Sequence, residues 1–155
     1  MGGIAQLPLT QVSVTASETR KSRFLAYRTD KENRAVCAAS RKWCLEFALE
    51  YAVSERDLWL LLGRPRWRTY RTWRKNHDAI LPRRDLKQVG RLLGILCALD
   101  ELTGHPWVAK LHFIQNIDEE YFGGLSIREY VISNPRNGLE KANRHLWSLV
   151  GPENE

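Results

Sequence analysis

The stretch ERDLWLLLGRPRWRTYRTWRKN, residues 55–76, carries the pattern that decides how this chain is organised. Residues 58–62 are almost entirely apolar, and the turn-forming sequence LGRP occupies residues 62–65. In residues 66–75 the aromatic side chains recur at every third position, which places them along one face of a helix. These aromatic residues are Trp67, Tyr70 and Trp73. The stretch therefore predicts two short helices joined by a turn, with Pro65 in the first turn of the second helix.

The opposite face of the second helix is basic. It consists of Arg68, Arg71, Thr72 and Lys75, with Arg66, Thr69 and Arg74 at its edges. A helix, a turn with glycine and a second helix that is aromatic inside and basic outside are typical of a helix-turn-helix, whose second helix enters a DNA groove. Because arginine forms paired hydrogen bonds with guanine and basic side chains bind phosphates, we expect six side chains to contact DNA. They are Arg66, Arg68, Thr69, Arg71, Thr72 and Lys75.

The net charge of the chain, +6, is concentrated around this stretch. Residues 1–63 carry a net charge of +2, residues 64–94 carry +8, and residues 95–155 carry −4. A basic face that meets only solvent is one explanation, and an anionic partner that binds locally is the other. Each Lys or Arg that meets a phosphate releases a condensed counterion, which gives such a partner its affinity.

Length and composition are those of a globular protein. The chain has 155 residues, of which 43% are hydrophobic and 27% charged, enough for one domain or two small ones. No run approaches the roughly 18 apolar residues of a membrane span, and the N-terminus lacks a charged region followed by a long apolar one. We therefore expect a cytoplasmic protein with no membrane partner. The odd set of Cys37, Cys44 and Cys97, without a CxxC pair, predicts reduced and mostly buried thiols.

Before the helix-turn-helix, the sequence predicts an arm and two helices. Residues 1–39 are expected to form a flexible N-terminal arm, in which residues 31–38 can form a short helix capped by Asp30. Ser40 is then expected to cap a stronger helix over residues 41–52. Its aromatic stripe at i, i+4 and i+8 predicts core side chains, namely Trp43, Phe47 and Tyr51. Ser54, with Asp57 three residues later, predicts a capping box for the next helix.

After the helix-turn-helix, four further helices are predicted. Residues 83–102 are apolar around much of the helix circumference and predict the central helix of the fold, ended by Thr103-Gly104. Residues 105–115 form the next, and Ser126 with Glu129 predicts a capping box for a short one. Residues 138–150 form the last, which ends at Gly151-Pro152. The side chains expected to face the core are Trp107, Leu111 and Ile114 in one helix and Leu139, Ala142, Leu146 and Leu149 in the last.

The fold class predicted from these patterns is all-α. No stretch alternates between apolar and polar residues over the length of a strand with turn signals at both ends. The connection of residues 116–125 contains Gly123-Gly124, which indicates a tight backbone or positive φ angles. A helix-turn-helix part is expected over residues 40–84 and a second helical part over residues 85–155.

The sequence contains no catalytic, metal or cofactor motif. The four histidines have no metal-ligand spacing relative to one another or to the cysteines, and there is no GxGxxG or Walker A sequence. Consecutive carboxylates at residues 118–120 are more typical of a solvated surface than of an acid/base pair. We therefore expect a protein that is not an enzyme and that has no cofactor or metal.

The order of motifs from residue 57 to residue 150 resembles the Xre/MbcA/ParS-like antitoxin family, in which a Cro-type helix-turn-helix precedes a small helical toxin-binding domain. The resemblance rests on the sequence from Leu61-Leu62-Gly63 to Trp73, on Arg91-Leu92-Leu93-Gly94-Ile95, on residues 107–116, and on Phe122-Gly123-Gly124-Leu125-Ser126. The segment from Asn134 to Gly151 is similar to the family's closing helix. The resemblance covers about 95 residues. The sequence departs from the family at Leu111-His112 and in the arginine-rich second helix. In the family, the tryptophan corresponding to Trp107 packs in the core.

The resemblance implies a type II antitoxin with two binding activities. The part from residue 85 to 155 would bind and neutralise a toxin, often a RES-type enzyme that degrades NAD, and its acidic tail would enter the toxin's active site. The residues so implied are Phe122, Gly123, Gly124, Arg144, Gly151, Pro152, Glu153, Asn154 and Glu155. The helix-turn-helix part would repress its own promoter by binding double-stranded DNA, as a homodimer or within a larger toxin–antitoxin assembly.

Other functions fit parts of the same sequence. The chain could be a stand-alone transcriptional regulator without a toxin, or an interaction module whose basic helix binds an acidic protein. Interleaved basic and aromatic residues could also stack on single-stranded bases. The common face of the three aromatic residues argues against this, because it predicts that they are buried.

Overall fold

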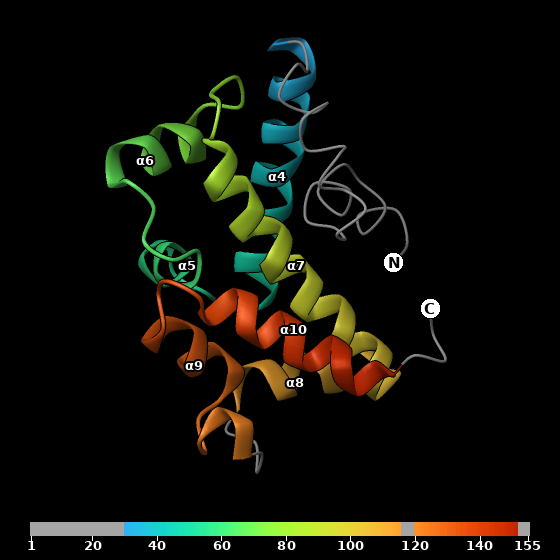
Figure 1. Ribbon diagram of the computed structural model, residues 1–155. Coiled ribbons are helices and arrows are strands. Elements are labelled where there is room, and N and C mark those ends of the chain that lie inside the picture. Colours follow the sequence, from blue (N-terminus) through green and yellow to red (C-terminus); the bar gives the residue numbers. More distant parts are fainter. Residues whose placement is uncertain (1–29, 116–119, 152–155) are drawn as a thin grey trace.

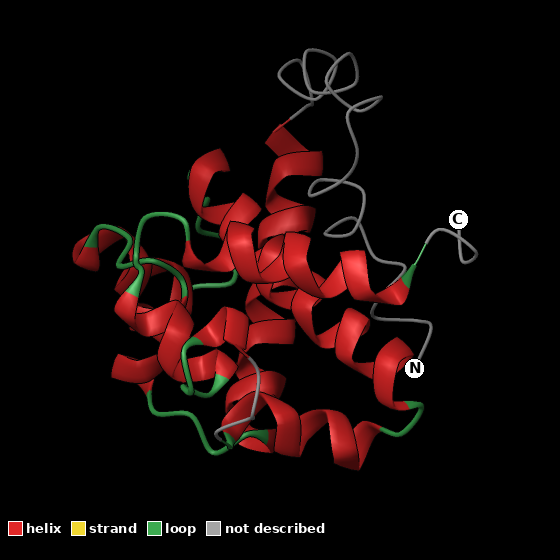
Figure 2. Ribbon diagram, turned by 60° about the horizontal axis from the view of Figure 1, so that its bottom comes forward, coloured by secondary structure: helices red, strands yellow, loops and turns green. Residues whose placement is uncertain are grey.

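The computed structural model describes residues 30–115 and 120–151, and every regular element in this part of the chain is a helix (Figures 1 and 2). The all-α prediction is therefore confirmed. The elements are α4 (Asp30–Glu50), α5 (Glu55–Leu61), α6 (Trp67–Lys75), α7 (Arg83–Thr103), α8 (Pro106–Ile114), η1 (Glu120–Phe122), α9 (Ile127–Ser133) and α10 (Gly138–Val150). Most of the predicted arm and the tail after Gly151 lie outside the described residues.

The long helix α7 is the centre of the fold, as predicted. It packs against α4 on one side and against α8 and α10 on the other (Figure 1). Val89, Leu92, Ile95 and Ala98 are fully buried in it, so its apolar residues contact neighbours around much of the circumference. Gly104 ends the helix in the left-handed conformation with a φ of +70°, where glycine is favoured.

The structure corrects the prediction of two helices before residue 52. A single helix, α4, runs from Asp30 to Glu50 and passes through Ser40 without a break. Ser40 is buried, and its hydroxyl donates to the Val36 carbonyl four residues earlier at 2.8 Å. This local bond lets a serine lie inside a helix, so the residue that looked like a cap is an interior residue.

The predicted boundary at residue 39 therefore falls inside a helix. Val36 and Cys37 lie on the arm side of that boundary, yet both are buried in the core. One continuous cluster of buried side chains includes residues of every α-helix from α4 to α10. Residues 30–39 thus belong to the packed structure and not to a flexible arm.

Two of the predicted helix starts are confirmed in atomic detail. The Ser54 hydroxyl accepts from the Asp57 N–H at 3.1 Å at the start of α5, while the Asp57 carboxylate pairs with Arg128 of α9. At the start of α9, Ser126 and Glu129 form the complete reciprocal capping box. The two caps fix the first turns of two short helices that contact each other.

The predicted inner faces of α8 and α10 are wrong in part. Trp107 is 58% exposed and Leu149 is 49% exposed. In α8 the side chains that enter the core are Ala109 and Phe113, and Phe113 packs edge-on against Phe47 of α4 and against Tyr51, which directly follows α4. Trp107 lies two positions before Ala109, a rotation of about 200° along a helix, so it points away from the core. The inward Leu139, Ala142 and Leu146 of α10 are confirmed.

Candidate nucleic-acid interface

The position of α6 is fixed by its inner face. Tyr70 and Trp73 are fully buried. The Trp73 indole N–H donates to the Cys37 carbonyl of α4 at 3.1 Å, and the Tyr70 hydroxyl donates to the Glu55 carbonyl of α5 at 3.2 Å. Burial in the core raises the pKa of the Tyr70 hydroxyl above its usual range, so it stays protonated and available as a donor. These contacts hold α6 against both α4 and α5.

The connection between α5 and α6 is a tight turn that reaches other parts of the fold. Gly63 has a φ of +82°, and a Cβ placed on it would lie 2.7 Å from Nε2 of Gln88 and 2.8 Å from the carbonyl oxygen of Pro135. Only glycine fits this backbone and this space. The turn is therefore locked between α7 and the loop before α10.

Pro65 was predicted in the first turn of the helix, but it lies immediately before the N-cap residue Arg66. Its carbonyl accepts a hydrogen bond from the indole N–H of Trp59 at 2.7 Å. This tertiary bond fixes the entry of the chain into α6. The side chain of the N-cap residue, Arg66, makes no capping hydrogen bond to α6.

Trp67 is the member of the aromatic face that departs from the prediction. It is 43% exposed, stacks on Tyr70 with ring centroids 5.7 Å apart, and packs edge-on against Trp59 at 5.4 Å. The aromatic stack thus begins in the core at Trp73 and ends at the surface. There Trp67 borders the basic side chains of the same helix.

The outward face of α6 is cationic and open. A shallow hollow of about 310 Å³ is lined by Trp67, Arg68, Arg71, Thr72 and Lys75. Arg66, Arg68, Arg71, Thr72 and Lys75 are exposed, Thr69 is half-buried, and α6 contains no acidic residue. The Thr72 hydroxyl donates to the Arg68 carbonyl of its own helix at 2.9 Å. Five of the six predicted DNA-contacting side chains are therefore presented together.

Arg74 was expected at the edge of this face, and the structure turns it inward. It is half-buried near Cys44 and Tyr70, and its Nε and Nη1 atoms are buried without a hydrogen-bond partner among the residues that the structure describes. Burial raises the pKa of the Cys44 thiol to about 12, an effect that the positive charge of Arg74 opposes. Arg41 of α4 donates to the Arg74 carbonyl at 2.9 Å, so this end of α6 is also tied to α4.

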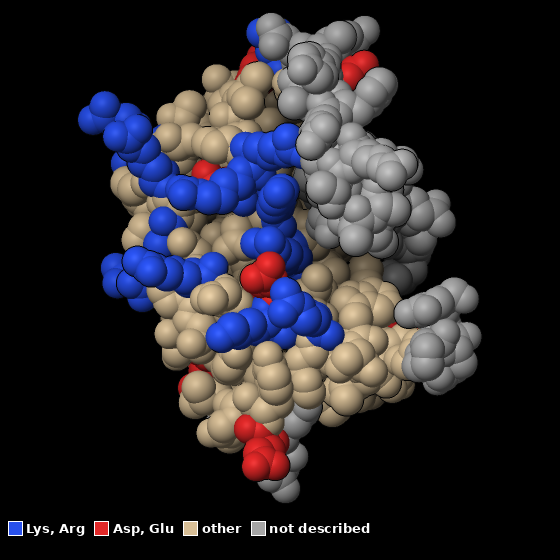
Figure 3. Space-filling view, viewed as in Figure 1, with Lys and Arg blue, Asp and Glu red and all other residues tan. Residues whose placement is uncertain are grey.

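The basic surface is larger than α6. Lys and Arg side chains gather over α6, the start of α7 and α10 on one face of the molecule (Figure 3). Arg64 in the turn and Arg83 and Arg84 in the first turn of α7 are exposed beside it. The charge of +8 in residues 64–94 signalled these residues, but helical periodicity within α6 alone could not identify them.

The residues implied in toxin binding are only partly gathered at the surface. Phe122 is 1% exposed and packs against Tyr130 and His145, so it is a core residue and not a contact residue. Gly123 and Gly124 are exposed, with φ angles of +62° and +83° that confirm the expected tight turn. Arg144 is exposed and lies 3.7 Å from Glu140. Gly151 follows α10, and residues 152–155 lie outside the described residues.

An aromatic pair that sequence analysis missed holds the glycine turn in place. The rings of Tyr121 and His145 are parallel, with centroids 3.9 Å apart, and the Tyr121 hydroxyl donates to the Lys141 carbonyl at 3.3 Å. These contacts fix the turn beside α10. The two partners are 24 positions apart in the sequence, and no local pattern predicts that they meet.

Comparisons with known proteins add nothing to these observations. Within the described residues, no group of three His, Cys, Asp or Glu side chains is placed to hold a metal ion, and no helix is long and apolar enough to cross a membrane. No protein-family model, curated protein or solved structure matches this chain.

Proposed function

We propose that this chain binds double-stranded DNA through the outward face of α6, as the DNA-binding half of an antitoxin that also neutralises a toxin protein. The observation that carries the proposal is the separation of the two faces of α6. One face is buried through Tyr70 and Trp73, and the other presents exposed cations without an intervening carboxylate. A helix held rigidly from behind and basic in front is suited to entering the major groove.

The flanking cations support the same partner. Arg64, Arg83 and Arg84 are exposed at either side of α6 and are placed to bind phosphates, which orient a protein on the duplex. Bases would then be read by Arg66, Arg68 and Arg71, since guanidinium groups pair with guanine. Of the threonines, Thr72 already bonds to its own helix and Thr69 is half-buried, so we assign them minor roles.

The DNA half is tested by the double variant Arg68→Ala with Arg71→Ala. It removes two cations of the hollow, so affinity for a duplex containing the chain's own promoter should fall about tenfold or more. The slope of log affinity against log salt should become shallower by about 0.9 for each of the two side chains that also contacts a phosphate, since only phosphate contacts release condensed counterions. Fluorescence anisotropy between about 50 and 200 mM salt measures both.

A matched control removes the same charge from another exposed helix. Arg34→Ala with Lys42→Ala in α4 also takes away two exposed cations, and α4 is not one of the helices over which the basic surface gathers. Its affinity should stay within a factor of about three of that of the unmodified protein, since weak long-range attraction is screened at these salt concentrations. Equal losses in both double variants would refute the assignment of binding to α6.

The toxin half of the proposal rests on the family resemblance and on two exposed features at the other end of the chain. The Gly123-Gly124 turn is open to solvent, and residues 95–155 carry a net charge of −4, which complements a basic nucleotide-binding cleft. Co-expression with the product of the adjacent reading frame tests it directly. Growth rescue together with co-purification would support neutralisation, and absence of both would remove this half.

The role of the acidic tail has its own test. Removing residues 151–155 should impair rescue of growth more than it impairs DNA binding, because these residues follow α10 in the sequence whereas the proposed DNA contacts belong to α6. Rescue and anisotropy on the same truncated protein give the two readings. Full rescue by the truncated protein would show that the tail is not the part that inhibits the toxin.

The second candidate is a stand-alone regulator. Phe122 is buried and Trp107 is exposed, so two residues that the resemblance placed in functional or core roles behave otherwise. A regulator without a toxin needs only the α6 surface. Promoter binding by a protein whose neighbouring gene product is harmless would favour it.

A further inference from the structure

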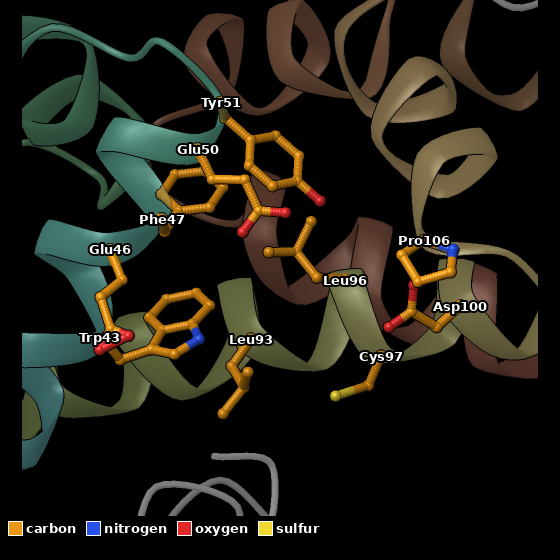
Figure 4. A pocket seen from close by; sticks show the side chains of 10 residues that line it. All are labelled: Trp43, Glu46, Phe47, Glu50, Tyr51, Leu93, Leu96, Cys97, Asp100 and Pro106. Atoms are coloured by element: carbon orange, nitrogen blue, oxygen red, sulfur yellow. The ribbon is translucent and has the colours of Figure 1, made fainter. Parts of the chain in front are cut away.

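A groove between α4 and α7 lies outside the proposed DNA-binding surface. It has a volume of about 290 Å³ (Figure 4). Its floor is apolar, formed by Trp43 and Phe47 of α4 and by Leu93 and Leu96 of α7. Three carboxylates line its edges, Glu46 and Glu50 from α4 and Asp100 from α7. The groove therefore suits a ligand that combines apolar side chains with positive charge.

The carboxylates of the groove are not neutralised by neighbours in the described part of the chain. No Lys or Arg lines the groove, and none forms an ion pair with these three groups there. Lys110 lies near one end of the groove, with its Nζ 5.7 Å from the ring centroid of Tyr51. Burial and then the charges of Glu50 and Glu101 raise the pKa of Asp100, so a cation bound here would relieve repulsion.

The chain itself contains a segment of matching chemistry. Residues 20–28, which lie outside the described residues, have the sequence RKSRFLAYR. The segment combines four basic residues with Phe24, Leu25 and Tyr27 and contains no acidic residue. It ends two positions before Asp30, where α4 begins, and α4 is the helix that forms one wall of the groove.

We propose that the first part of this segment, residues 20–25, binds in this groove of the same molecule, with Phe24 and Leu25 at the Trp43 end of the floor and basic side chains at Glu46, Glu50 and Asp100. Along α4, Trp43 lies about 20 Å from Asp30 and Glu50 about 30 Å, at 1.5 Å per residue. At up to about 3.3 Å per residue, an extended chain that returns along α4 places Phe24 up to about 20 Å and Arg20 up to about 33 Å from Asp30, so residues 20–25 can reach the groove and residues 26–28 serve as the link to α4. The short tether gives it a millimolar effective concentration. Docking of this segment is independent of DNA or toxin binding.

Cross-linking to a native cysteine tests the proposal in the full-length protein. Cys97 lines the groove and is half-exposed, whereas Cys37 and Cys44 are buried. Ser22→Cys should form an intramolecular disulfide with Cys97 under mild oxidation, at least tenfold faster than Val14→Cys, which lies outside the segment. A disulfide requires Cα atoms within about 7 Å, so a fast reaction reports docking. Peptide mass spectrometry identifies the pair.

The possible outcomes are distinct. Equal rates at positions 14 and 22 would overturn the proposal, because they would reflect the tether alone. A disulfide between two chains, seen as a dimer on a non-reducing gel, would also overturn it and would assign the groove to a second copy. Loss of the product in Cys97→Ala confirms that the observed bond is the intended one.

A charge-reversal series tests the recognition itself. Glu46→Lys with Glu50→Lys changes two exposed side chains and should slow the cross-linking of the fastest position at least tenfold. Reversing Arg20, Lys21 and Arg23 to Glu in that background should restore it. The control, Asp78→Lys with Glu120→Lys, changes the net charge equally at exposed sites outside the groove and should leave the rate unchanged. An unaffected rate in the groove variant would overturn the proposal.

Discussion

At the scale of single residues, Trp73 connects the core to the proposed DNA-binding surface. Its ring is fully buried, and its indole N–H satisfies the carbonyl of Cys37 on α4. Trp67, nearly two turns earlier in the same aromatic stack, packs its ring against Tyr70 and Trp59 and remains 43% exposed. The two tryptophans therefore differ in what they stabilise, although the sequence pattern treats them alike.

Replacing these tryptophans one at a time measures the difference. Trp73→Ala should lower the free energy of unfolding by about 3–5 kcal/mol, because it leaves a cavity in the core and an unsatisfied carbonyl. Trp67→Ala should cost about 1–2 kcal/mol, the scale of the lost aromatic contacts and partial burial. Urea denaturation followed by circular dichroism provides both values. Similar costs would mean that the burial of Trp73 is not what holds α6.

Residue periodicity predicted much of the outward face of α6 but not the orientation of the side chains at its edges. Arg68, Arg71, Thr72 and Lys75 share a face because their spacing dictates it. Arg74 turns inward toward Cys44 and Tyr70, and Trp67 turns outward, because α4 and α5 approach from directions that the sequence of α6 does not encode. The same reasoning explains Trp107, whose helix meets the core through Ala109 and Phe113.

At the scale of elements, the helix caps differ in how much of each helix they support. Ser126 is fully buried and exchanges two hydrogen bonds with Glu129, at 3.0 Å and 3.2 Å. Ser54 is exposed and receives one, from the Asp57 N–H. Both caps were predicted from the sequence, since a serine followed three residues later by an acidic residue is a local signal.

The burial of the caps sets the cost of removing them. Ser126→Ala should destabilise the protein by about 2 kcal/mol and Ser54→Ala by about 0.5 kcal/mol, the two ends of the range for cap removal, because water can replace only the exposed hydroxyl. Thermal and urea unfolding of the two single variants compare them directly. A larger loss at Ser54 would show that burial does not control the contribution of a cap here.

Helix boundaries were predicted well where a glycine or a proline ends the pattern and poorly elsewhere. Gly104 and Gly151 end α7 and α10 as expected, each with a positive φ. Within α4 no glycine or proline occurs, so no such residue marks where the helix begins or ends. That the helix continues through Ser40 depends on the burial of Val36 and Cys37, which is a tertiary property. The stacking of Tyr121 on His145 was beyond prediction for the same reason.

At the scale of the whole molecule, the core does not divide where the sequence pattern does. Residues of α4, α5 and α6 share one continuous buried cluster with those of α7 to α10. The Asp57–Arg128 ion pair joins α5 to α9, and Gly63 packs against Gln88 and the Pro135 carbonyl. The division at residue 84 is a functional prediction and not a boundary in packing.

This continuity predicts one cooperative unfolding transition. Circular dichroism at 222 nm, which follows all helices, and tryptophan fluorescence, to which the buried Trp43 and Trp73 contribute, should give coincident midpoints in urea. A variant in α9 such as Ser126→Ala should shift both midpoints together. Separate transitions, with α4 to α6 unfolding apart from α7 to α10, would contradict the single core.

The hydrogen bond between Trp73 and Cys37 also determines which helices would have to be moved together to graft α6 into another protein. Cys37 accepts from Trp73 through its carbonyl, and its sulfur lies 3.2 Å from the Leu81 amide, so one residue of α4 holds both the C-terminal part of α6 and the loop that follows it. A graft of α5 and α6 alone into another scaffold would leave these anchors behind. Transfer of the proposed DNA-binding surface to another protein would therefore have to move α4 together with α6, as one inherited block.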